Sequence, residues 1–265
     1  MKKWLSWIFL FAVLLFIYLP IVILAIYSFT NSAIIGKWNG FSFDLYKQLF
    51  TVERLRKTIL NTVLLAVLAS GLSAILGTLG AIGVFYNKKW LGKYVKSASH
   101  IPVINAEIVT AISLALVFAL FNIGRSYFAL LMGHMVLCTP FVMLSVLPKL
   151  KQMDGSLYEA ALDLGATPTQ ALFKVIIPEI MPGIFSGFML AITLSLDDYM
   201  ISAYTKPTTL DTISTYVYQA VKNQNKSMLP ALRALSAVIF FVMIIVVIVI
   251  NLRASKKSAV KSTVK

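Results

Sequence analysis

The sequence has little charge, and acidic charge is the scarcest. Charged residues make up 13% of its 265 residues, with 10 acidic against 24 basic side chains, while hydrophobic residues reach 59%. This composition excludes an ordinary soluble domain and is typical of an integral membrane protein. The formal net charge of +14 could suggest a nucleic-acid partner. The basic residues flank apolar runs, however, as topology signals do, so we expect no nucleic-acid binding.

Signature motifs of several enzyme classes are also missing. The chain has no GxxxxGK[ST] sequence, so it does not cradle ATP phosphates by itself, and it has neither GxSxG nor HExxH. Its one cysteine, Cys138, cannot form an intrachain disulfide. His134 and Cys138 have the spacing of metal ligands on a helix, but the sequence places no third ligand beside them. We therefore expect neither catalytic residues nor a metal site.

Long apolar runs are what the sequence has instead. Each is long enough to cross a hydrocarbon core of about 30 Å. Lys2 and Lys3 precede the first run as in a signal peptide, but the run is long and no cleavage site follows, so we expect a retained helix. We predict an all-α integral membrane protein with six transmembrane helices, near residues 8–29, 59–86, 98–121, 127–148, 180–204 and 231–252.

Lysine and arginine residues indicate the orientation of these helices. Dense basic clusters in 87–97 and in the tail 253–265 place both termini in the cytoplasm. Three basic residues fall on the outer side in this arrangement and do not fit it: Arg54, Arg56 and Lys57. The same orientation puts the segment 154–178 in the cytoplasm.

The segment 154–178 is the one long stretch that is neither apolar nor simply basic. Its first part predicts a short helix with Ser156 as N-cap and Glu159 reaching back from the third helical position, a capping box. Gly165 can adopt the left-handed conformation that ends a helix.

A second short helix is predicted to follow at once. Thr167 is its expected N-cap, Pro168 fills its first position and Gln170 completes a second capping box, while Pro178 is expected to end it. Each helix has roughly 8–10 residues, too few to span a bilayer at about 1.5 Å per residue. The sequence therefore predicts a helix pair on one membrane face, available to a soluble partner.

Three acidic residues lie inside apolar runs: Glu107, Asp197 and Asp198. A charge at a helix centre costs roughly 2.5–3.5 kcal/mol on insertion scales, so such residues normally face a cavity or a partner. They could pair with a second subunit or be protonated on burial, or they could line a path for a cation. Neighbouring helical residues point about 100° apart, so Asp197 and Asp198 share a cavity only if the helix unwinds there. We favour Asp198 with Glu107 over Asp197.

Aromatic residues surround the outer half of this route. Tyr199 follows the acidic pair, and Trp38 lies in the first outer loop. Tyrosine and tryptophan at a membrane boundary are usually interfacial anchors. Contact between their rings and an alkylammonium substrate is the alternative.

One motif in 154–178 resembles that of a known family. Glu159, Ala160 and Ala161, followed by Gly165 and a run to Pro178, resemble the EAA loop of permease subunits of binding-protein-dependent ABC importers. The family pattern ends in I-x-L-P, and this chain has conservative replacements at its first and third positions. Four further segments look like the C-type subunits of spermidine/putrescine permeases, so the resemblance covers nearly the whole chain: LPIVILAIYSF, WNGFSFDLYKQLF, IVTAISLALVF and LSLDDYMISAYTKP.

The resemblance implies a fold and a function. It implies a type I importer permease, one transmembrane domain over 1–265 with a core at 59–252, a cytoplasmic coupling loop at 149–179 and a basic cytoplasmic tail at 253–265. Such a chain would be a multi-pass protein of the bacterial plasma membrane that carries polyamines and is not an enzyme. It would hold no cofactor, because ATP and Mg²⁺ would be bound by a partner ATPase.

The resemblance also implies partners. A cytoplasmic dimer of ATP-binding subunits would grip the helix pair, a second and non-identical permease would complete the path, and an extracytoplasmic polyamine-binding protein would deliver solute to 30–57 and 205–230; membrane lipid would surround the rest. Glu159 would cap its helix and meet a basic group of the ATPase, and Gly165 would permit the sharp turn. The expected ATPase-packing face is apolar: Leu157, Ala160, Ala161, Leu162 and Leu164.

Other functions remain as alternatives. Sister permeases for iron, thiamine or other small cations share much of this scaffold. An intramembrane aspartyl protease needs two facing carboxylates that share a proton, whereas Asp197 and Asp198 lie on one predicted helix. A purely structural membrane subunit would tolerate neutralising all three acids.

Overall fold

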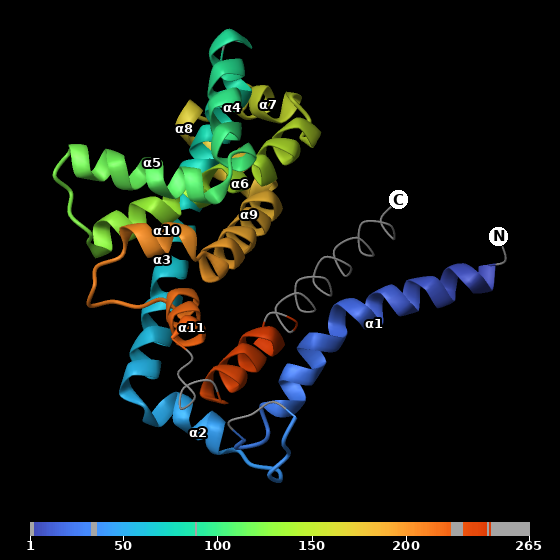
Figure 1. The fold of residues 1–265 in the computed structure, drawn as a ribbon. Coiled ribbons are helices and arrows are strands. Elements are labelled where there is room, and N and C mark those ends of the chain that lie inside the picture. Colours follow the sequence, from blue (N-terminus) through green and yellow to red (C-terminus); the bar gives the residue numbers. More distant parts are fainter. Residues whose placement is uncertain (1–2, 33–35, 88, 224–229, 243, 245–265) are drawn as a thin grey trace. The chain divides into compact units, whose positions relative to one another are not determined.

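The computed structural model describes residues 3–32, 36–87, 89–223, 230–242 and 244. Every element in these ranges is helical (Figure 1). The chain divides into two compact units, one formed by Met1–Lys57 with Val217–Lys265 and the other by Thr58–Tyr216. Two helices, α3 (Glu53–Tyr86) and α11 (Ile213–Lys222), begin in one unit and end in the other.

The first unit contains α1 (Lys3–Tyr27), α2 (Asp44–Thr51) and the apolar helix Pro230–Val242. The side chains of α1 are mostly exposed large hydrophobics, as expected for a helix surrounded by lipid. After α1 the chain is held by rings, since Phe29 stacks on Phe41 at 5.3 Å and also contacts Phe43 and Tyr46. The hydroxyl groups of Ser28 and Tyr46 lie 2.6 Å apart, and the Arg233 guanidinium donates to the Ser32 carbonyl.

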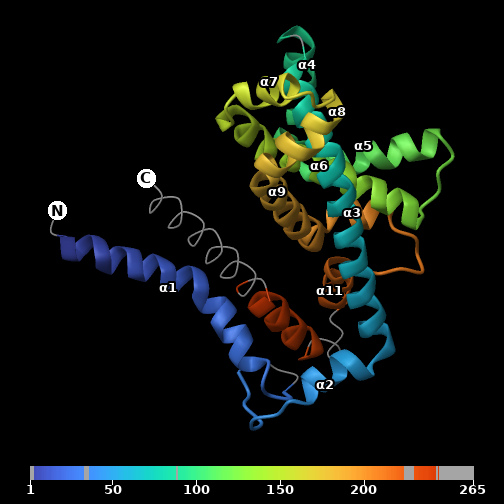
Figure 2. The same ribbon diagram turned by 180° about the vertical axis from the view of Figure 1, so that it is seen from behind.

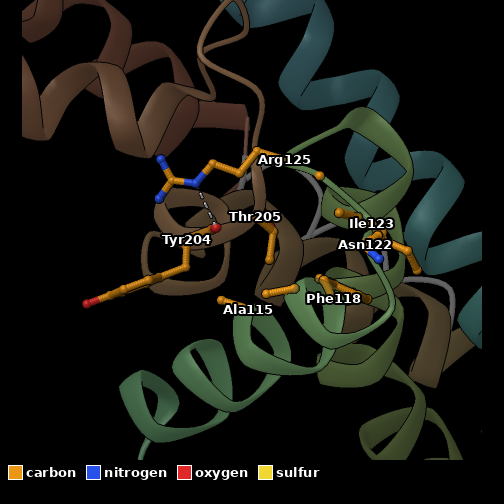
Figure 3. A pocket seen from close by; sticks show the side chains of 10 residues that line it. Ala115, Phe118, Asn122, Ile123, Arg125, Tyr204 and Thr205 are labelled. Atoms are coloured by element: carbon orange, nitrogen blue, oxygen red, sulfur yellow. Dashed lines mark hydrogen bonds between the residues drawn. The ribbon is translucent and has the colours of Figure 1, made fainter.

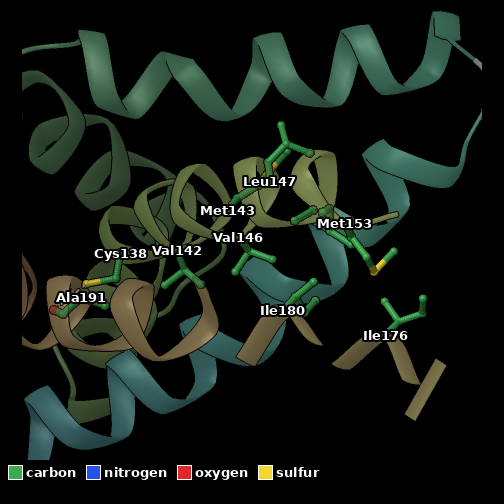
Figure 4. Close-up of a cluster of buried hydrophobic side chains, with 11 residues drawn as sticks. Cys138, Val142, Met143, Val146, Leu147, Met153, Ile176, Ile180 and Ala191 are labelled. Carbon is green, nitrogen blue, oxygen red and sulfur yellow. Dashed lines mark hydrogen bonds between the residues drawn. The ribbon is translucent and has the colours of Figure 1, made fainter. Parts of the chain in front are cut away.

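The second unit is built on a helix pair, α6 (Tyr127–Gln152) and α9 (Ile177–Asp197). Between them and α3 lies the main cluster of buried apolar side chains (Figure 4), formed by Ala81, Cys138, Val142, Met143, Val146, Leu147, Leu150, Met153, Ile176, Ile180 and Ala191. Glycines let the helix backbones approach one another. A Cβ added to Gly187 would lie 3.0 Å from the Val142 Cα, and one added to Gly77 of α3 would lie 2.7 Å from the Val142 Cβ. This close packing is typical of membrane helices.

Among the described residues, four helices are long and apolar enough to cross a membrane: Ser6–Tyr27, Glu53–Tyr86, Tyr127–Gln152 and Pro168–Asp197. They correspond to the predicted spans near 8–29, 59–86, 127–148 and 180–204. The predicted span 231–252 is described only up to Val242, where the helix Pro230–Val242 ends, and at residue 244; its other residues lie outside the described ranges.

The predicted single helix 98–121 is wrong. The structure has two helices here, α4 (Lys89–Ile104) and α5 (Glu107–Leu120), and the bend between them is 110°. Pro102 lies in the last turn of α4, where it removes a backbone donor. Ala106 then adopts extended backbone angles, so a new helix starts at Glu107.

The predicted continuous helix 180–204 is also wrong, because it breaks at Asp198 and Tyr199 before α10 (Met200–Thr205). Asp198 is extended, with φ −61° and ψ 125°, and its carboxylate accepts the backbone amides of Ile201 and Ser202. A short acidic side chain that binds nearby amides offers the backbone an alternative to the helix. The unwinding needed for Asp197 and Asp198 to approach one site is therefore present.

Pro178 does not end the second short helix, contrary to the prediction. The helix α8 (Pro168–Ala171), the π-helical turn η1 (Leu172–Ile176) and α9 form one uninterrupted stretch through Pro178. Proline conflicts with normal α-helical bonding because it lacks an amide proton and its ring meets an earlier carbonyl. Just before Pro178, the Ile177 amide bonds instead to the Leu172 carbonyl, the wider π spacing that accommodates an interruption.

Candidate functional site

The three intramembrane acids meet where the two broken spans pack together. Glu107 is the first residue of α5, Asp197 is the last residue of α9, and Asp198 lies in the break before α10. The helices α5 and α10 are in contact, and the Glu107 carboxyl interacts with both Asp198 and Asp197. The structure thus unites residues that the sequence separates by about a third of the chain. Broken helices that meet in this way form the solute sites of many transporters.

Asp198 is the buried member of this acidic cluster. Asp198 is 3% exposed. One of its carboxylate oxygens accepts the Ile201 amide at 3.1 Å, and the other accepts the Ser202 amide at 2.8 Å. Asp197, by contrast, is exposed on this chain, as is Glu107. The sequence favours Asp198 over Asp197 as a solute contact, whereas the burial pattern favours the reverse. Whether either residue touches solute stays a prediction.

A buried histidine extends the acidic cluster toward α6. The Nδ1 atom of His134 lies 2.8 Å from the Ser195 hydroxyl, and its Nε2 atom lies 3.0 Å from the Ser202 hydroxyl. Nε2 is also 3.3 Å from the Asp198 carboxylate. Sequence reasoning paired His134 with Cys138, whose thiol instead faces the Ala191 carbonyl at 3.4 Å. A histidine inside an apolar span indicates a buried polar contact. The partners of His134 could not be predicted, because they lie 61 and 68 residues away in sequence.

The two aromatic candidates lie in different units. Tyr199 is half-buried within the break itself, next to Asp198. Trp38 belongs to the other unit, where its half-exposed ring contacts the edge of Tyr27 at 6.2 Å. Tyr199 therefore lies beside the acids, and a role for Trp38 in the solute path stays a prediction.

A pocket of about 410 Å³ opens near the far ends of α5 and α10 (Figure 3). Its lining is mostly apolar, and none of the three acids contributes to it. Arg125, at its rim, donates to the Tyr204 carbonyl at 3.2 Å and to the Ala203 carbonyl at 3.4 Å. A cation at the last carbonyls of a helix stabilises that end, so Arg125 fastens the C-terminus of α10 to the loop before α6.

The first helix of the predicted pair is present with a different cap, whereas the second is only the start of the longer stretch Pro168–Asp197. The first helix, α7, runs over Ser156–Asp163. Ser156 does not form the expected capping box with Glu159, because its amide and hydroxyl both donate to the Asp154 carboxylate, at 3.0 and 2.8 Å. These two bonds from Ser156 lower the pKa of the Asp154 carboxyl. Asp154, and not Ser156, thus accepts the backbone amide at the start of α7. Side chains of both residue types can accept hydrogen bonds from nearby amides.

The turn at Gly165 and the N-terminal cap of α8 agree with the prediction. Gly165 has φ +85°, the left-handed conformation. Thr167 and Gln170 form the predicted capping box, with the Gln170 amide donating to the Thr167 hydroxyl at 3.3 Å and the Thr167 amide donating to the Gln170 side chain at 3.1 Å. Pro168 occupies the first helical position, as expected.

Only part of the expected apolar face of this loop points outward. Leu164 is 90% exposed, and Glu159, Ala160 and Leu157 are also exposed. Ala161 is 8% exposed and faces its own protein, so it cannot form part of an outer surface. Pro178 is exposed on α9.

The loop is anchored to the rest of the second unit. Tyr158 of α7 packs on Tyr86 at the end of α3, with ring centroids 5.5 Å apart, and α7 also contacts η1. Figures 1 and 2 show α7, α8 and one end of α4 gathered at the same end of this unit.

Comparison with known proteins identifies the family. Residues 1–255 match the family model for the binding-protein-dependent transport system inner membrane component. The spermidine/putrescine transport system permease protein PotC of Haemophilus influenzae is 32% identical over 87% of this chain and 89% of its own. PotC of Escherichia coli K12 is 31% identical over 89% of both chains, and the putrescine permease PotI of the same organism is 31% identical over 84% of this chain and 81% of its own.

Solved structures agree on the fold. A bacterial ABC transporter that imports the polysaccharide alginate matches with a TM-score of 0.72, 17% identity and coverage of 95% of this chain and 94% of the other. The same kind of transporter in complex with its periplasmic protein matches with a TM-score of 0.67 and 20% identity, over 94% and 93% of the two chains. The fold is that of an ABC importer permease, a membrane transport component rather than an enzyme. The chain belongs to the family of inner membrane components of binding-protein-dependent transport systems.

Proposed function

We propose that this chain is one permease subunit of an ATP-driven importer that moves polyamines, spermidine or putrescine, across the plasma membrane. The observation that carries the proposal is the acidic cluster of Glu107, Asp197 and Asp198 at the meeting of two broken spans. The curated relatives named for spermidine and putrescine transport support the choice of solute.

The chemistry of the acidic cluster suits a polycation. A polyamine carries two or more positive charges that lose water inside the membrane. A carboxylate and an ammonium group 4 Å apart attract each other by about 4 kcal/mol at an effective dielectric constant of 20. Glu107 sits in the first turn of α5, where the positive end of the helix dipole favours a carboxylate by about 0.3–1 kcal/mol. The helix start thus offsets a small part of the cost of a carboxylate in this setting.

The surface loop formed by α7 and α8 is the proposed contact with the subunits that hydrolyse ATP. We place a dimer of cytoplasmic ATP-binding subunits on the loop formed by α7 and α8, and assign ATP and Mg²⁺ to those subunits. With both termini in the cytoplasm, this loop lies on the cytoplasmic side. A second, non-identical permease would complete the path, and an extracytoplasmic polyamine-binding protein would deliver the solute. Both partners fit the family to which the chain belongs.

The experiment is uptake of labelled spermidine by cells that lack the chain, with and without the restored gene product. We expect restoration to raise uptake at least about tenfold and unlabelled putrescine to compete. Iron and thiamine serve as matched competitors for sister permeases of this scaffold. If spermidine uptake is the same with and without the chain, or if iron or thiamine competes and polyamine does not, the assignment of polyamine as the solute is wrong. The assignment as a permease would still stand.

A further inference from the structure

His134 lies at the centre of a buried polar network that joins three helical segments. Its ring is fully buried on α6, and it contacts Ser195 in the last turns of α9, Asp198 in the break, and Ser202 in the first turn of α10. One side chain therefore ties a continuous helix to both sides of a discontinuous one. Nothing in the transport role described so far uses it.

The surroundings of His134 favour one tautomer of its ring. The Nε2 atom lies 3.0 Å from the Ser202 hydroxyl and 3.3 Å from the Asp198 Oδ2 atom, and a proton on Nε2 is attracted by that carboxylate. In this tautomer the Nδ1 atom accepts from the Ser195 hydroxyl, 2.8 Å away. The same Oδ2 atom also accepts the Ser202 amide at 2.8 Å. The histidine ring and the backbone of α10 thus both lie against one carboxylate oxygen.

The backbone packing beside His134 is equally close. A Cβ added to its neighbour Gly133 would lie 2.6 Å from the Ile201 Cγ2 atom, so α6 touches α10 directly at this point. From the other side, the Ser214 hydroxyl donates to the Asp198 carbonyl. The residue that breaks the helix is therefore held at both its carboxylate and its peptide group by other segments.

We propose that His134 is a positioning residue for the solute path: it holds Asp198 in the break, so that the neighbouring Asp197 and the facing Glu107 keep their accessible arrangement. His134 itself is buried and does not touch solute. This inference rests on the proposed function where it assigns solute binding to the acids. The geometry it assigns to the break stands independently of the solute.

The test uses the assembled transporter and three variants of one helix. His134→Ala removes the contacts with Ser195, Asp198 and Ser202. His134→Gln places an amide nitrogen near the position of Nε2 and so keeps a donor beside Ser202 and Asp198. Ser145→Ala is the matched control on α6, because the Ser145 hydroxyl bonds only to its own helix, at the Phe141 carbonyl.

We expect His134→Ala to raise the KM for labelled spermidine about tenfold while Vmax per transporter stays within about twofold, because loss of position weakens solute binding more than turnover. His134→Gln should recover most of this loss, and Ser145→Ala should behave like wild type. In a double-mutant cycle, Ser202→Ala should add little to His134→Ala, since both break the same network. Equal effects of Ala and Gln, or strict additivity with Ser202→Ala, would overturn the proposal.

The single cysteine supplies a readout that does not depend on the solute. Cys138 lies one turn from His134, is fully buried and faces α9. We expect N-ethylmaleimide to label it in membranes carrying His134→Ala, but not in wild type, His134→Gln or Ser145→Ala. If wild type carries no spermidine, the proposed function fails while this labelling pattern still decides the role of His134. Labelling that is the same in all four proteins would refute the positioning role.

Discussion

At the scale of single residues, two adjacent aspartates have different tasks. Asp198 is enclosed: its carboxylate accepts two backbone amides and lies 3.3 Å from the His134 ring, whereas Asp197 is exposed at the end of α9. Burying a carboxylate costs free energy unless hydrogen-bond donors satisfy it, so each donor to Asp198 stabilises the fold. The same residue type therefore maintains the fold at one position and offers charge at the next.

This difference predicts that the two Asp→Asn substitutions affect different properties, the amount of folded transporter in one case and the KM for spermidine in the other. Asp198→Asn puts an amide NH₂ against donors, which costs about 1–3 kcal/mol and should reduce the amount of folded transporter. Asp197→Asn removes one exposed charge and should leave the amount unchanged while raising the spermidine KM about tenfold.

Membrane abundance by immunoblot and uptake kinetics separate the two effects. Glu179→Gln, an exposed acid at the start of α9, is the control and should change neither. Normal abundance of Asp198→Asn with strongly weakened uptake would assign the solute contact to Asp198 after all.

At the scale of helices, hydropathy predicted where apolar segments lie but not where they break. Both halves of 98–121 are apolar, so the 110° bend after Ile104 leaves no trace in a hydropathy profile. The break at Asp198 depends on a side chain capturing the amides of Ile201 and Ser202, a competition decided by tertiary contacts. The turn at Gly165 and the cap at Thr167 were predictable because their causes are local in sequence.

The loop supplies a prediction at this scale. Gly165 has φ +85° with open space around its Cα, so Gly165→Val is disfavoured by backbone conformation and not by crowding. The left-handed region costs a residue with a Cβ about 1–2 kcal/mol, and the turn between α7 and α8 should shift. We expect ATP hydrolysis to continue while uptake per ATP falls about tenfold.

Two neighbouring changes serve as controls. Gly155 has φ −61° and open space, so Gly155→Ala should leave coupling intact. Gly165→Asn should be milder than Gly165→Val, because asparagine tolerates the left-handed region. A normal ratio of transport to hydrolysis in Gly165→Val would remove this turn from the coupling step.

At the scale of the whole molecule, the loop and the acidic cluster lie at the two ends of one helical stretch. Residues Pro168–Asp197 run without interruption from the capping box at Thr167 to the break at Asp198. We expect a displacement of the loop by a bound ATP-binding subunit to move the far end of this stretch, where the acids lie. The anchoring of α7 on Tyr86 and η1 adds a second connection between the loop and the helices behind it.

A partner surface at the loop end is the last testable consequence. Leu164 is 90% exposed at a turn where its own protein offers no cover, and burying a leucine contributes about 1.5–3 kcal/mol. Leu164→Asp should therefore weaken binding of the ATP-binding subunits by about 10- to 100-fold, measured as their co-purification with the tagged permease. Asp163→Asn, an exposed change one residue earlier, is the control and should retain them. Because Leu164 contributes nothing to the buried core, the permease itself should insert normally; full retention of the ATP-binding subunits by Leu164→Asp would show that they bind elsewhere.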